Sequence, residues 1–169
     1  MSSSIQLSPP AQFLSLNRRE GPNNVFVLTL QKPPENRLDS TFCQEIIRAL
    51  RHVERTVGPD APGALVTTTE SQKFFCTGLD LNEPDTNPYA NSEGFYPLLA
   101  ALLDFPYPTV ACVTGHTFGG ACPFALAHDY RVMNSDRGFF SMVCVTPADA
   151  GVVTLLTFET ATSGPGFAF

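Results

Sequence analysis

Three short apolar segments, rich in β-branched residues, recur along the chain with helical patterns between them. They cover residues 24–31, 63–69 and 109–114, and polar residues, glycine or proline flank each one. This length and composition are typical of buried strands, whereas a membrane-spanning helix needs about 18 or more consecutive apolar residues. Strands that alternate with helices favour an α/β fold with right-handed crossovers.

The clearest helix signal lies between the first two strands. Asp39, Ser40 and Thr41 supply oxygens suited to an N-cap, and Gln44 follows Thr41 by three residues, as in a capping box. An apolar stripe at helical spacing follows and ends at Gly58. The stripe consists of Phe42, Ile46, Ala49, Leu50 and Val53.

Weaker patterns continue the alternation. Shorter helices are predicted over residues 98–103 and 121–128, and further strands over residues 129–133 and 138–142. Residues 1–12 are rich in serine and proline, so we expect them to form a flexible arm that adds little to the core.

Charge and cysteine usage exclude several classes of protein. Ten Lys and Arg against 16 Asp and Glu give a net charge of −6 without a basic stripe, so no nucleic-acid partner is expected. The five cysteines are scattered without a C-x-x-C pair, so no metal site is predicted. With 43% hydrophobic residues, no long apolar run and no secretory signal at the N-terminus, the chain is expected to be a soluble globular protein without a membrane span.

Two glycine-bearing turns follow the two most apolar strands, at residues 75–80 and 115–121. Loops at the carboxyl ends of strands are where α/β sheets bind ligands, and glycine lets backbone approach a ligand closely. Together the turns offer two amide donors to one oxygen, which is what an oxyanion hole requires. The alternative is that both are ordinary tight turns.

The residues of these turns resemble the enoyl-CoA hydratase/isomerase (crotonase) family. Four motifs follow the family's order, namely NRLD at 36–39, FFCTGLDL at 74–81, VTGHTFGGA at 113–121, and AHDYRVM at 127–133 with RGF at 137–139. The resemblance covers residues 12–142 and is closest to Δ3,Δ2-enoyl-CoA isomerase-like members.

The resemblance implies a crotonase-like ββα spiral core over residues 13–142, incomplete because the family's C-terminal helical segment is lacking. It implies acyl-CoA thioester substrates, with coenzyme A as part of the substrate and no separate cofactor. The backbone amides of Leu79 and Gly120 would form the oxyanion hole that stabilises a thioester enolate. The substrate-binding residues would be Cys76, Thr77, Gly78, Leu79, Asp80, Gly119 and Gly120.

Both carboxylates of the family pattern are missing. Pro123 stands three residues after the second oxyanion glycine, where hydratases carry a Glu. Val143 and Cys144 stand where isomerase-like members carry theirs. A positioned base contributes roughly 10²–10⁴ to a proton transfer, so turnover should fall severely unless another group substitutes.

The candidate substitutes are poor. Cys144 is an unactivated thiol, and Asp149 would have to swing in from the tail. His116 either donates to the thioester or the coenzyme A phosphates, or packs at the pocket rim. Asp80 is expected to cap its own turn rather than act as an acid.

Three functions therefore stand side by side. The first is an enoyl-CoA isomerase/hydratase-like enzyme, and the second is a catalytically inactive acyl-CoA-binding remnant or partner of a full-length paralogue. A hydrolase is a poor third, because the chain has no G-x-S-x-G nucleophile elbow. The family favours a peroxisomal or cytoplasmic setting, although this chain carries no targeting signal, and it favours a homo-oligomer, typically a trimer. Residues 143–169 form an atypical tail, for which we consider a translated intron or a frameshift.

Overall fold

Two β-sheets and three α-helices make up the part of the chain that the computed structural model describes, which is residues 2–21, 23–58, 60–134, 138–145, 153–158 and 167–168. The larger sheet has the strand order β1-β2-β3-β4-β6-β8-β11, and the smaller has the order β10-β9-β7-β5. In the larger sheet, β3, β4, β6 and β8 are successive parallel neighbours. This arrangement confirms the predicted α/β class.

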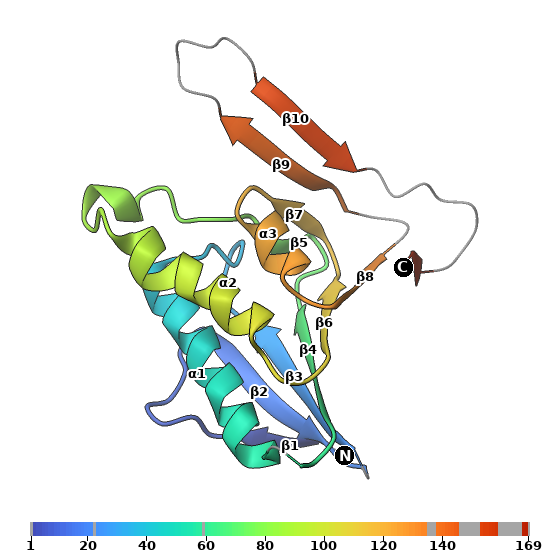
Figure 1. Cartoon of the computed structure of the whole chain (residues 1–169). Coiled ribbons are helices and arrows are strands. Elements are labelled where there is room, and N and C mark those ends of the chain that lie inside the picture. Colours follow the sequence, from blue (N-terminus) through green and yellow to red (C-terminus); the bar gives the residue numbers. More distant parts are fainter. Residues whose placement is uncertain are drawn as a thin grey trace.

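The strands of the larger sheet are β1 (Ser2–Ile5), β2 (Leu14–Arg19), β3 (Asn24–Leu30), β4 (Gly63–Thr69), β6 (Thr109–Val113), β8 (Tyr130–Asn134) and β11 (Phe167–Ala168). Those of the smaller sheet are β5 (Phe74–Cys76), β7 (His116–Phe118), β9 (Phe140–Val145) and β10 (Val153–Phe158). The helices are α1 (Ser40–Val57), α2 (Tyr96–Leu103) and α3 (Ala121–Leu126), with a 3₁₀ turn at Glu83–Asp85 and a π-helical turn at Asn91–Phe95. Figure 1 shows α1 and α2 side by side, with α1 over β2 and β3, and α3 beside β7.

The first helix begins at Asp39, whose side chain accepts a hydrogen bond from an amide of the first turn at 2.8 Å. The predicted capping box of Thr41 and Gln44 does not form, because the helix starts before Thr41 and Gln44 donates to a backbone carbonyl before α2. Instead, the carboxylate of Glu83, which is distant in sequence, accepts a hydrogen bond from the Ser40 amide at 3.0 Å. The cap therefore joins α1 to the loop that follows β5.

The N-terminal residues differ from the predicted flexible arm. Strand β1 pairs antiparallel with β2, and Leu7 is buried in the hydrophobic core. The amides of Gln12 and Phe13 each donate to the buried carboxylate of Glu45 on α1, at 2.9 Å. A serine-rich sequence shows no apolar alternation, so this pairing depends on backbone and carboxylate partners that the pattern does not reveal.

Two further differences concern element boundaries. The glycine-bearing turns contain the three-residue strands β5 and β7, which are too short to show a periodic pattern. The predicted core boundary at residue 142 falls inside β9, and α3 ends at Leu126 rather than at 128. Within the described ranges, no α-helix follows α3, and no helix is long and apolar enough to cross a bilayer.

Candidate oxyanion site

The smaller sheet brings the two glycine-bearing turns into contact. Strands β5 and β7 are parallel neighbours, so the residues that follow them emerge at the same edge. A Cβ atom added at Gly78 would lie 2.7 Å from the Phe118 carbonyl oxygen and 2.9 Å from the Gly120 nitrogen. Gly78 also has a φ of 95°, a conformation that favours glycine. The close approach of the turns therefore depends on the missing side chain at position 78.

The amide N–H of Leu79 lies between two backbone groups that are both bonded to Leu38. Leu38 donates to the Gly78 carbonyl at 2.8 Å, and its own carbonyl accepts from the Asp80 amide at 2.9 Å. Peptide groups alternate in direction along an extended chain, so the N–H of Leu79 faces away from Leu38. A Cβ at Gly120 would lie 3.5 Å from the Leu79 nitrogen and 2.9 Å from its Cγ. The two predicted donors are thus neighbours in space.

In the part of the chain that the structure describes, the N–H groups of Leu79 and Gly120 donate no hydrogen bond to a backbone or side-chain acceptor. Both residues are half-buried. Unpaired backbone donors in partly buried positions are uncommon in folded proteins, and a pair of them suits one shared oxygen acceptor.

The side chains of three other predicted binding residues form hydrogen bonds in and next to the first turn. Cys76 is fully buried, its thiol donates to the Asn36 carbonyl at 3.0 Å, and burial raises the pKa of this thiol to about 12. Cys76 is therefore a packing residue rather than a nucleophile. The hydroxyl of Thr77 donates to Glu35 at 3.2 Å. Asp80 accepts from the Asn82 amide at 3.0 Å, the turn-capping role expected for it.

His116 packs in an aromatic stack. Its ring centroid lies 5.5 Å from that of Phe118 and 5.3 Å from that of Phe139, with interplanar angles of 12° and 5°. Its Nδ1 accepts a hydrogen bond from the Phe139 amide at 3.1 Å. These contacts favour the packing alternative for His116 over a direct role in chemistry.

A base for proton transfer is not supplied at the expected positions. Pro123 lies within α3, in the place of the hydratase glutamate. At position 144 the structure describes the backbone of β9 but not the cysteine side chain, and Asp149 and Arg137 lie outside the described residues. Within those residues, no three His, Cys, Asp or Glu side chains gather as metal ligands.

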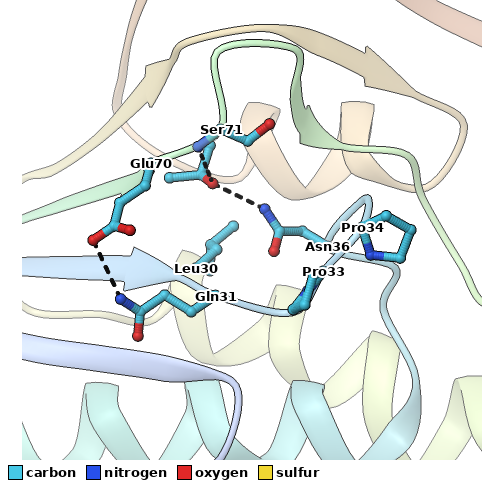
Figure 2. Close-up of a pocket in the computed structure, with 8 residues that line it drawn as sticks. Leu30, Gln31, Pro33, Pro34, Asn36, Glu70 and Ser71 are labelled. Atoms are coloured by element: carbon cyan, nitrogen blue, oxygen red, sulfur yellow. Dashed lines mark hydrogen bonds between the residues drawn. The ribbon is translucent and has the colours of Figure 1, made fainter.

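A cleft of about 310 Å³ lies at the carboxyl ends of β3 and β4. Figure 2 shows Asn36 reaching from the loop after β3 toward the end of β4. The lining residues are Leu30, Gln31, Pro33, Pro34, Asn36, Thr69, Glu70 and Ser71. A second hollow, of about 270 Å³, lies at Pro106 and Tyr130, and neither space is lined by Leu79 or Gly120.

The sequence analysis gives no role to two residues near the turns, Asn36 within the NRLD motif and Glu83. Asn36 is almost completely buried and has a φ of 52°, a conformation that asparagine tolerates better than most residues. An Asn two residues after a Pro-Pro pair is the only sequence signal for that turn. The pairing of Glu83 with the start of α1 leaves no such signal, because 43 residues separate Glu83 from Ser40.

Comparison with known proteins identifies the family of this chain. Residues 20–147 match the family model described as enoyl-CoA hydratase/isomerase. Enoyl-CoA delta isomerase 1, peroxisomal, of Arabidopsis thaliana is 33% identical over 131 residues, which cover 76% of this chain and 52% of that protein. Enoyl-CoA delta isomerase 2, peroxisomal, of the same plant is 35% identical over 128 residues, which cover 70% and 52%.

Solved structures show the same fold. The structure of Pseudomonas aeruginosa DspI superposes with a TM-score of 0.67 at 26% identity and covers 78% of this chain and 49% of that one. An enoyl-CoA hydratase from Bacillus anthracis gives a TM-score of 0.67 at 20% identity, with coverage of 78% and 51%. The chain spans about half the length of the curated relatives it matches. Because the family model matches three quarters of its length, the chain belongs to the enoyl-CoA hydratase/isomerase family.

Proposed function

We propose that this chain binds acyl-CoA thioesters and that the N–H groups of Leu79 and Gly120 hold the thioester oxygen. The observation that carries the proposal is the meeting of these two unpaired donors across the glycine turns. When an α-proton leaves an acyl-CoA, negative charge develops on that oxygen. Fixed amide dipoles in a partly dry site stabilise the developing charge without reorganising at that moment.

The reaction that best suits this site is double-bond migration in an enoyl-CoA, as the names of the Arabidopsis relatives suggest. In a 3-enoyl-CoA this requires a base to take a proton from C2, so that the dienolate forms, and the protonated base then to return a proton to C4. Hydration is less well supported, because Pro123 has neither a side-chain acid nor a base to activate water. The peroxisome is the compartment we propose, since two of these relatives are named peroxisomal.

A second function has its own support. The positions that would carry the family's carboxylates hold Pro123 and Cys144, so binding without turnover is also consistent with the sequence. In that case the two amides would polarise a bound thioester, and no proton would be removed. Such a protein would act as an acyl-CoA-binding partner of a full-length relative.

One experiment separates the two functions. The purified chain is mixed with a 3-enoyl-CoA, and binding is followed by calorimetry while formation of the 2-enoyl isomer is followed by absorbance. Binding with isomerisation supports the enzyme, and binding alone supports the inactive binder. The acyl-CoA proposal is wrong if neither the thioester nor its saturated analogue binds.

A further inference from the structure

We propose that Asn36 is a positioning residue that sets the direction of the Leu79 amide. The inference rests on the proposed function, because the direction of this amide matters for chemistry only if it holds a thioester oxygen. Asn36 acts through other groups, since its side-chain nitrogen donates to the Thr69 hydroxyl and the Phe75 carbonyl.

The conformation of Asn36 closes the loop between β3 and α1. Its backbone N–H donates to the Lys32 carbonyl at 2.7 Å, and its side-chain Oδ1 accepts from the Lys32 amide at 2.8 Å. With a φ of 52° and an exposed fraction of 4%, Asn36 is held in a left-handed turn inside the protein. Buried polar groups of this kind persist when every one of their hydrogen bonds is made.

The side-chain amide of Asn36 joins the two sheets. Its Nδ2 donates to the Thr69 hydroxyl at 3.1 Å, at the end of β4, and to the Phe75 carbonyl at 3.0 Å, in β5. Its backbone carbonyl accepts from the Cys76 thiol at 3.0 Å. The dashed line that leaves the labelled Asn36 in Figure 2 is its bond to the hydroxyl at the end of β4. One residue therefore ties the loop to the larger sheet and to the strand that enters the first turn.

The hydrogen bonds of Asn36 keep the loop before α1 aligned with the first turn, so that backbone hydrogen bonds form between the two segments. The Thr77 amide donates to the Glu35 carbonyl at 3.1 Å, and Leu38 bonds to both neighbours of Leu79 as described above. If the loop moved relative to β5, the peptide group between Gly78 and Leu79 would rotate with it. The Leu79 N–H would then no longer point at the thioester oxygen, the acceptor that it is proposed to share with the Gly120 N–H. Displacements of about 1 Å in such groups cost on the order of 10²-fold in rate.

The test compares N36D with E45Q. N36D keeps an oxygen for the Lys32 amide but faces the Phe75 carbonyl with an acceptor instead of a donor. E45Q disturbs another buried hydrogen-bonded side chain, which anchors Gln12 and Phe13 far from the turns in sequence. A second pair, T69V and T69S, removes or keeps the hydroxyl that accepts from Asn36 and remains informative if N36D does not fold.

Two measurements are made on the full chain. Without ligand, the amide chemical shifts of Leu79 and Gly120 report on the turn itself. With an acyl-CoA carrying ¹³C at the thioester carbonyl, infrared difference spectra report how strongly the site lowers the carbonyl stretching frequency. If the wild type turns over, we also expect N36D to lower kcat by roughly 10²-fold with a smaller change in KM.

We expect N36D and T69V to shift the Leu79 amide resonance and to lose most of the carbonyl frequency lowering, while T69S and E45Q resemble the wild type. The inference is overturned if N36D retains the wild-type lowering, or if E45Q loses as much. A wild type that binds no acyl-CoA, or leaves the carbonyl frequency unchanged, overturns the proposed function and this inference together. A wild-type effect that survives in N36D overturns only the role of Asn36.

Discussion

The two turns of the oxyanion site are held in place by different parts of the chain. The first turn is attached to the loop that precedes α1, through the bonds that Leu38 makes on both sides of Leu79. The second turn is attached to β9, where Thr117 donates to the Phe139 carbonyl at 2.8 Å and Gly119 to the Ser141 carbonyl at 3.0 Å. One support precedes its turn in the sequence and the other follows it. The site therefore depends on segments about 100 residues apart, which must both fold before two amides can meet.

The largest expected effect comes from adding a methyl group between the turns. Gly78→Ala places a Cβ within 3 Å of two backbone atoms of the second turn, and neither atom can move without shifting β7 or α3. Position 78 also has a positive φ. We expect the free energy of unfolding to fall by about 4 kcal/mol or more, measured by urea denaturation.

Gly119→Ala is the matched control. Gly119 also has a positive φ, of 53°, but an added Cβ there meets nothing within 4 Å. Only the backbone strain remains, so the loss should be about 1–2 kcal/mol. Equal losses in the two variants would show that close approach of the turns is not what requires glycine at position 78.

The next largest effect concerns the segment after α3, the helix that follows the second turn. His128 is buried two residues after the end of α3. Its Nδ1 donates to the Phe124 carbonyl at 3.0 Å, and its Nε2 accepts from the Thr67 hydroxyl at 2.9 Å. Burial lowers the pKa of His128 to about 4 from its ordinary value of 6.5. Between pH 6.5 and about pH 4, His128 is therefore protonated in the unfolded chain and neutral in the folded chain.

Stability should be unaffected by this group above pH 6.5 and should fall as the pH drops from 6.5 to about 4. The loss attributable to His128 is roughly 3 kcal/mol over that range. Urea denaturation at several pH values should show a flatter dependence for His128→Gln than for the wild type. An unchanged slope in the variant would contradict the assigned burial of a neutral His128.

Gly120→Ala should affect the site more than the fold. The Cβ in Gly120→Ala would lie 2.9 Å from Cγ of Leu79, at a flexible side chain rather than at backbone. The side chain can rotate, so stability should fall less than in Gly78→Ala, while the acceptor position becomes crowded. If the wild type isomerises a 3-enoyl-CoA, we expect about a 10²-fold lower rate. A variant with wild-type rate and carbonyl polarisation would remove Gly120 from the site.

The smallest effect concerns the aromatic stack beside the second turn. Phe139→Ala removes a half-exposed ring whose centroid lies 5.3 Å from that of His116, but leaves the backbone bond to Nδ1 in place. We expect a loss of about 1 kcal/mol or less in urea denaturation. A loss as large as that of Gly78→Ala would mean that side-chain stacking, rather than backbone pairing with β9, holds the second turn.

Local patterns predict much of the fold. The apolar runs at 24–31, 63–69 and 109–114 correspond to β3, β4 and β6, and the amphipathic stripe corresponds to α1. These elements are long enough for periodicity and caps to mark them. The sequence does not predict β1, β2, β5 and β7 as strands. Three or four residues carry no readable period in β1, β5 and β7, and only Leu14 and Leu16 alternate as buried apolar residues in β2.

The sequence by itself determined the α/β class, the family and the identity of the two glycine turns, because these follow from residue types in short contiguous stretches. Only the tertiary structure decided that the two glycine turns touch, that the N–H groups of Leu79 and Gly120 donate to no acceptor among the described residues, and that Asn36 bonds to both sheets. The physical reason is that the direction of a peptide group is set by hydrogen bonds to distant segments. Those partners are specified by packing, which no local pattern records.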